Sequence, residues 1–96
     1  MITLLMTYHC KPGKSQEFLD LIHKEGIPQA SRAEEGCAGY RYFRPIEGPV
    51  DDILLVEQWK DQDALDIHAA TAPFKRLQEI KAEYVAETVK ERLDTK

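Results

Sequence analysis

The 96-residue sequence has only two cysteines, one tryptophan and no long apolar run. Its longest uninterrupted apolar stretch, Ile53–Val56, is far shorter than the ~20 residues that cross a bilayer as a helix. Cys10 and Cys37 have neither metal-ligand nor redox-motif spacing. They predict reduced thiols in a cytoplasmic protein, with no bound metal.

Positive charge is also scarce, since 17 acidic residues face 13 basic ones and the net charge is -4. A nucleic-acid-binding domain normally carries a basic patch or stripe, so this class is not expected. The sequence also has no glycine-rich phosphate loop, serine-nucleophile motif or flavin signature. These absences predict a protein that binds neither nucleic acid nor a membrane.

What is present is ordinary for a globular protein, with 43% hydrophobic and 31% charged residues. The length predicts one domain over residues 1–96, because domains rarely have fewer than ~50 residues. A chain this short buries only ~60–68% of the surface that it exposes when unfolded. A second copy of the chain would therefore help to stabilise it.

Alternation of side chains predicts three strands, at residues 2–10, 37–44 and 53–60. The third strand is apolar on both faces in its first half, so we expect it to be central and covered on both sides. Apolar spacing predicts helices after Ser15, over Pro28–Glu35, from Gln62 and from Pro73.

The tail is ambiguous. The spacing of Leu77, Ile80 and Tyr84 slightly favours a continued helix, whereas Val85 and Val89 favour a strand. If the tail is a strand, the order is βαββαβ, the split βαβ of ferredoxin-like α+β folds. Such a fold has an antiparallel sheet with helices on one face, and a second subunit would cover the other face.

Several segments resemble those of a known family, in the right order along the chain. They are Lys11–Lys14, Glu35–Tyr40, Leu54–Trp59 and Asp63–Phe74. With them the chain resembles the antibiotic biosynthesis monooxygenase superfamily of dimeric α/β barrels, and within it the quinol monooxygenases. The resemblance implies a last strand over residues 84–93, a homodimer, and cofactor-independent oxidation of a small quinol or phenol.

The sequence departs from this family at positions that matter for chemistry. Leu55 and Leu65 stand where the polyketide-tailoring members have Asn and Tyr, although Trp59 is retained. Phe74 stands where the quinol monooxygenases have a second His, and His68 stands where the heme-degrading members have a second Trp. Two alternatives therefore stay open: a dimeric small-ligand-binding or stress-response protein, and an isomerase or lyase of a small carbonyl compound.

His68 is the candidate catalytic residue, because it lies on the apolar side of its predicted helix. An imidazole with an ordinary pKa of about 6.5 accepts a phenolic proton near neutral pH. The alternative is a hydrogen-bonded His packed between helix and sheet. The inward carboxylate of Glu57 either positions a substrate hydroxyl or, as we favour, pairs with Arg41 or Arg44.

The candidate substrate-binding residues are aromatic or lie at the family positions named above. Trp59 either forms a wall of the cavity or is a core aromatic residue. Tyr40 either donates to a quinone-like oxygen or, as we favour, packs with its hydroxyl at the rim. The full expected set is Trp59, Phe74, Tyr40, Glu57, Leu55 and Leu65.

Overall fold

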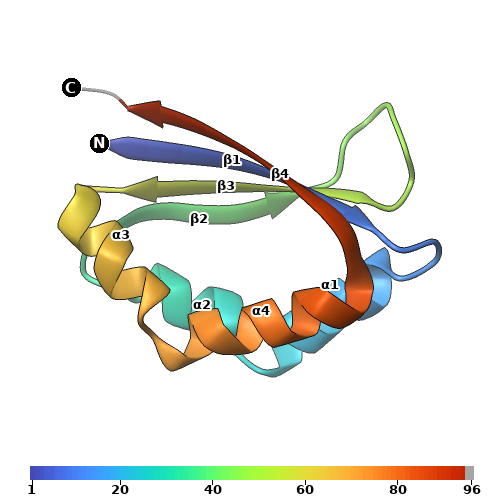
Figure 1. Cartoon of the computed structure of the whole chain (residues 1–96), viewed down its shortest axis with the longest axis horizontal. Coiled ribbons are helices and arrows are strands. Elements are labelled where there is room, and N and C mark those ends of the chain that lie inside the picture. The colour runs from blue at the N-terminus through green and yellow to red at the C-terminus, as the bar shows by residue number, and fades with distance from the viewer. Residues whose placement is uncertain (95–96) are drawn as a thin grey trace.

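The computed structural model describes residues 1–94, which form a four-stranded sheet with four helices on one of its faces (Figure 1). The strands are ordered β2-β3-β1-β4, and every neighbouring pair is antiparallel. The predicted ferredoxin-like α+β fold is confirmed, and the sheet stays open within one chain. The elements are β1 (Ile2–Cys10), α1 (Ser15–Lys24), α2 (Ile27–Arg32), β2 (Cys37–Phe43), β3 (Asp52–Trp59), α3 (Gln62–Ala69), α4 (Ala72–Tyr84) and β4 (Val85–Asp94).

The tail is a strand, so the helical periodicity was misleading there. Helix α4 ends at Tyr84, whose carbonyl accepts a hydrogen bond from the Lys11 N–H at 2.9 Å. The β-branched Thr88 and Val89 then pair with Tyr8 and Thr7 of β1. Pairing with an already formed strand outweighs the helix propensity of the intervening Glu and Lys residues.

Strand alternation separates two sets of side chains. On β3, Ile53, Leu55 and Trp59 face the helices and are fully buried, whereas Leu54 and Val56 face the opposite side and are only partly buried. The prediction of a strand covered on both sides therefore holds for one face within the chain. None of the helices in residues 1–94 is long and apolar enough to cross a membrane.

Two caps and one close contact hold α3 and α4 in place. The Asp61 carboxylate accepts from the Ala64 N–H at 2.8 Å, and the Thr71 hydroxyl oxygen accepts from the Phe74 N–H at 3.2 Å. Gly36, just before β2, lies so close to α3 that a Cβ there would clash with the side chain of Ala64. This contact fixes the part of α3 that carries the candidate catalytic residue.

Candidate functional site

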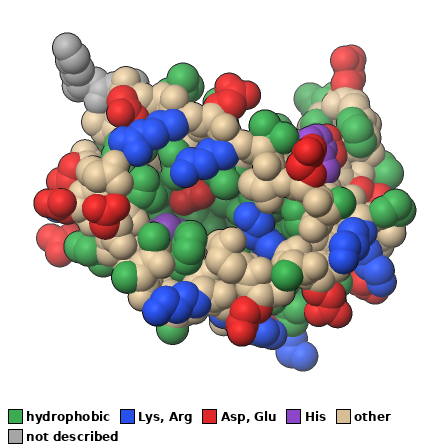
Figure 2. Space-filling model, in the orientation of Figure 1, with side chains coloured by type: hydrophobic (Ala, Val, Ile, Leu, Met, Phe, Trp, Pro, Cys, Tyr) green, Lys and Arg blue, Asp and Glu red, His purple; other side chains and the backbone are tan. Residues whose placement is uncertain are grey.

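A cavity of about 340 Å³ lies between the sheet and helices α3 and α4. Figure 2 shows the hollow, in which acidic and histidine atoms are visible and which Lys and Arg side chains border. Its volume is at the lower end of the range that is usual for small-molecule sites. The lining residues that matter below are Tyr8, Tyr40, Glu57, Leu65, Asp66, His68, Phe74, Lys81, Lys90 and Arg92.

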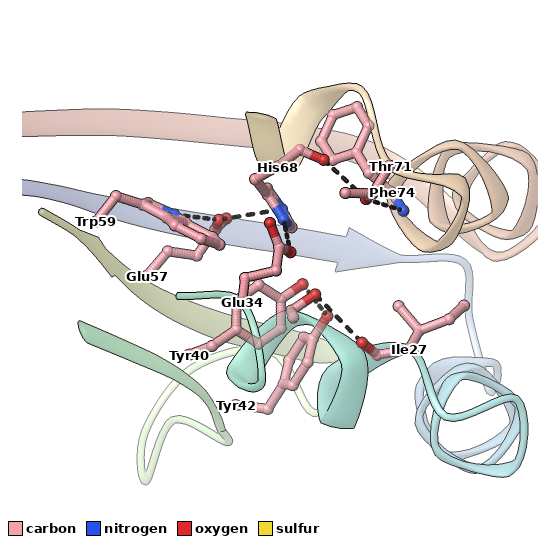
Figure 3. A network of polar contacts seen from close by, with 10 residues as sticks. Ile27, Glu34, Tyr40, Tyr42, Glu57, Trp59, His68, Thr71 and Phe74 are labelled. Carbon is pink, nitrogen blue, oxygen red and sulfur yellow. Dashed lines mark hydrogen bonds and ion pairs between the residues drawn. The ribbon is translucent and has the colours of Figure 1, made fainter. Parts of the chain in front are cut away.

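His68 lies at the inner wall of this cavity, in the last turn of α3. Its side chain is only 3% exposed, and its Nδ1 lies 2.7 Å from Oε2 of Glu34 (Figure 3). The imidazole stacks on the Trp59 indole, with ring centroids 4.3 Å apart, and meets the edge of Phe74 at 5.2 Å. Packing and one hydrogen bond therefore hold the ring in a single orientation.

Glu57 faces the same ring from β3. Its Oε1 accepts a hydrogen bond from Trp59 Nε1 at 3.1 Å and lies 3.8 Å from His68 Nε2. Burial raises the pKa of Glu57, an effect that the Trp59 hydrogen bond and the nearby His68 ring partly offset. The carboxyl group is thus more readily protonated than an exposed one.

The expected ion pair between Glu57 and Arg41 or Arg44 is wrong. Arg41 pairs in register with Val56 on the helix-free face, where its guanidinium lies over the Phe43 ring. Arg44 donates to the hydroxyl of Ser15 and to the side-chain oxygen of Gln16. Glu57 instead has Trp59 and His68 as its neighbours.

Glu34 is the site residue that the sequence reasoning missed. It follows the short helix α2 and is separated from His68 by 34 positions, so no local periodicity connects the two residues. Its Oε2 holds His68, while its Oε1 is buried without a hydrogen-bond partner in the part of the chain described. Oε1 of this carboxylate can therefore accept one more hydrogen bond.

The other predicted residues divide into two groups. Tyr40, Leu65 and Phe74 line the cavity, whereas Leu55 and Trp59 lie in the buried core and are not among its lining residues. The Tyr40 hydroxyl lies 3.4 Å from that of Tyr42, and burial raises the pKa of Tyr40 to about 12. Tyr40 is therefore a neutral hydrogen-bond donor at physiological pH.

Cations occupy the side of the cavity that is formed by α4 and β4. Lys81 lies with its Nζ 4.5 Å from the centre of the Tyr8 ring, and Lys90 and Arg92 also line the cavity. Within residues 1–94 no three His, Cys, Asp or Glu side chains are grouped so as to hold a metal ion. The arrangement can bind an aromatic molecule and move a proton to or from its hydroxyl.

A comparison with known families agrees with this geometry. The sequence model described as "Antibiotic biosynthesis monooxygenase" matches residues 1–80. The chain belongs to this family. The match ends within α4. It therefore covers the first three strands, helices α1 to α3 and most of α4, together with Glu34, Glu57 and His68.

Individual proteins are also similar to the chain. A Bacillus subtilis protein with the name "Putative monooxygenase YcnE" is 39% identical over 75 residues, covering 78% of this chain and 76% of its own. A conserved protein from Methanosarcina mazei is 29% identical, with a TM-score of 0.86 over 99% of this chain and 92% of its own. A solved antibiotic biosynthesis monooxygenase is 26% identical, with a TM-score of 0.84 over 99% and 98%.

Proposed function

We propose that this chain is a monooxygenase that oxidises a small quinol or related phenol, with the substrate itself supplying the electrons to dioxygen. The observation that carries this proposal is the Glu34–His68–Glu57 series at the wall of an aromatic-lined cavity. Membership of the family and the likeness to a monooxygenase relative support the reaction class. The substrate class rests on the cavity and its proton-accepting group.

His68 is the base in this proposal. In the tautomer that donates Nδ1–H to the Glu34 carboxylate, the ring has a free lone pair on Nε2, the atom that lies 3.8 Å from Glu57 Oε1. A quinol hydroxyl placed in the cavity would transfer its proton to Nε2, and the Glu34 carboxylate would stabilise the imidazolium that forms. The resulting phenolate is a far better reductant than the neutral phenol.

The overall reaction balances without another reductant. A quinol and dioxygen give a hydroxyquinone and water, so one oxygen atom enters the ring and the other leaves as water. The substrate loses two hydrogen atoms and gains one oxygen atom, which is a four-electron oxidation, and these four electrons reduce dioxygen completely. Tyr40, neutral at physiological pH, would donate a hydrogen bond to the developing quinone oxygen.

Oxygen uptake with a quinol tests this function directly. We expect consumption of dioxygen without added metal or flavin, and one labelled oxygen in the product when 18O2 is used. His68→Ala should lower the rate by on the order of 100-fold or more, which is typical for the loss of a general base. His23→Ala, an exposed histidine on α1, is the matched control and should retain the rate.

Other outcomes would point to the two alternatives. Turnover without incorporated oxygen would indicate an isomerase or lyase. Tight binding without turnover would indicate a ligand-binding or stress-response protein. Equal rates for wild type and His68→Ala would rule out the role of His68 as base.

We also propose that the protein acts as a homodimer, because its helix-free sheet face suits a second copy. One row of residues across this face consists of Arg41, Val56, Leu5 and Glu91. This row has a cation at one edge of the sheet, two apolar side chains in the centre and an anion at the other edge. A two-fold axis between the two sheets, parallel to the strands and passing through the centre of this row, would place each Arg41 edge over the partner's acidic edge. The two free thiols, Cys10 and Cys37, support a cytoplasmic location for this dimer.

Light scattering after size-exclusion chromatography tests the dimer. Val56→Asp should give a monomer, because it buries a charge in the centre of the interface. Ile67→Asp, an equally drastic change at an exposed position of α3, should leave the dimer intact. Arg41→Glu should weaken the dimer and the added Glu91→Arg should restore it; a dimeric Val56→Asp protein would contradict this interface.

A further inference from the structure

The charges around the cavity differ from those of the whole chain. The chain has a net charge of -4, yet the cavity has three cations, Lys81, Lys90 and Arg92, against two carboxylates, Glu57 and Asp66. The cations are also grouped, since all three come from α4 and β4. An acidic protein therefore gathers cations on one side of its candidate site.

Two of these cations have no counter-ion among the described residues. Arg92 binds Asp94 through two hydrogen bonds, of 2.8 and 3.3 Å. By contrast, no carboxylate among residues 1–94 lies within ion-pair distance of Lys81 or Lys90, and Asp66 accepts from Gln62 instead. Both lysines therefore have free donors near the cavity.

Lys81 is the more buried of the two lysines and the more fixed. Its ammonium lies over the Tyr8 ring, and burial lowers its pKa while the charge of Glu57 opposes that effect. An unpaired ammonium that is partly withdrawn from water gains most from an incoming anion. Lys90 is exposed on β4 and adds a second positive charge, which also acts on Glu57.

We propose that the cavity takes an anionic aromatic substrate, a hydroxylated aromatic acid whose acidic group binds Lys81 and Lys90 while its hydroxyl faces His68. The hydroxyl end rests on the proposed function above; the acidic end rests on the two lysines alone. Such a ligand has an acceptor for the cations on the α4–β4 side and a proton for the base on the α3 side. The cavity thereby sets both the charge and the direction of the substrate.

Anaerobic calorimetry with matched probes tests the charge of the ligand. The probes are 2,5-dihydroxybenzoate, its neutral analogue 2,5-dihydroxybenzamide, and hydroquinone. The benzoate should bind about tenfold or more tightly than the benzamide, the usual gain from hydrogen bonds to a charged group. This preference should fall as salt is raised, because the Lys90 side of the site is open to solvent.

Variants then assign the preference to the two lysines. Lys90→Met, on an exposed position, should reduce it severalfold, and Lys81→Met with Lys90→Met should remove it. Methionine is unbranched and uncharged, so it removes the ammonium that lies over Tyr8, and circular dichroism checks that each variant folds. Lys75→Met, an exposed α4 lysine that does not line the cavity, should keep the full preference.

Three results would overturn this inference: equal binding of benzoate and benzamide, a preference that survives in the double variant, or no binding of any probe. None of them decides the proposed function, which oxygen uptake with hydroquinone measures separately. Uptake without a charge preference would leave the oxygenase standing and remove the anionic substrate. A charge preference without oxygen uptake would support the anionic ligand and remove the oxygenase.

Discussion

The two ends of the layer between helices and sheet are built differently. At the α1 end, Phe18 and Ile22 are completely buried, and Phe18 packs edge-on against Tyr8 with ring centroids 5.7 Å apart. At the α3 end, the same layer has a cavity of about 340 Å³ and buries two ionisable side chains, Glu57 and His68. One end is a packed apolar core, and the other end contains the candidate site.

The difference teaches how a chain of 96 residues can have both a core and a candidate binding site. Apolar burial at the α1 end stabilises the fold, and this allows the α3 end to keep groups whose burial is unfavourable unless they are paired. Tyr8 borders both regions, since it contacts Phe18 on one side and lines the cavity on the other. The predictions below compare the two ends through single substitutions.

The largest effect is expected when an aromatic side chain is removed from the packed core at the α1 end. Phe18→Ala should lower the free energy of unfolding by about 3–5 kcal/mol, because the buried ring leaves a hole that its neighbours cannot fill. Phe74→Ala, at the wall of the cavity, should lower it by only about 1–2 kcal/mol, because that ring is partly exposed already. Urea unfolding at one fixed protein concentration measures both, and equal losses would contradict the comparison.

The second prediction concerns the contact that holds α3. Gly36→Ala should lower the free energy of unfolding by about 1–3 kcal/mol, because the new methyl group clashes with Ala64. It should also slow oxygen uptake, since any shift of α3 moves His68 away from Glu34 and Glu57.

Gly39→Ala is the control for this change. A Cβ there meets only the flexible side chain of Gln58, with the nearest atom at 3.0 Å. We expect a smaller loss of stability and an unchanged rate. A Gly36→Ala protein with wild-type stability would show that α3 adjusts freely, so that the site is less rigid than its contacts indicate.

Much of the fold was predictable because it depends on local pattern. Alternation located the first three strands to within about one residue, and the resemblance to a family, rather than periodicity, located β4. The helix after Gly26 was less well predicted: it spans Ile27–Arg32 rather than Pro28–Glu35. Residues 33–35 leave the helix, and one of them, Glu34, turns toward the site.

The site was predictable only in part, because its contacts join distant residues. Alternation correctly pointed Glu57 inward, but the same alternation places Arg41 on the opposite face, which is why their pairing was wrong. The contact between Glu34 and His68 and the approach of Lys81 to Tyr8 depend on how α2 and α4 pack on the sheet. The spacing of residues along the chain contains neither contact.

The smallest effect is expected from Glu57, the buried carboxylic acid at the α3 end. Because burial raises the pKa of Glu57, the folded chain holds its proton to a higher pH than the unfolded chain does. Its protonation therefore stabilises the fold at low pH, and this contribution is lost as pH rises through the folded pKa. Glu57→Gln removes the titration and keeps an oxygen that accepts from Trp59.

We therefore expect Glu57→Gln to leave stability nearly unchanged below the ordinary pKa of a glutamate and to raise it modestly at neutral pH. Urea unfolding midpoints across this pH range measure the effect. Glu79→Gln, an exposed glutamate of α4, is the control and should not change the pH profile in this way. A Glu57→Gln protein that is less stable than wild type at neutral pH would contradict this expectation. It would show that the charged carboxylate, held by Trp59 and His68, stabilises the α3 end, just as apolar packing stabilises the α1 end.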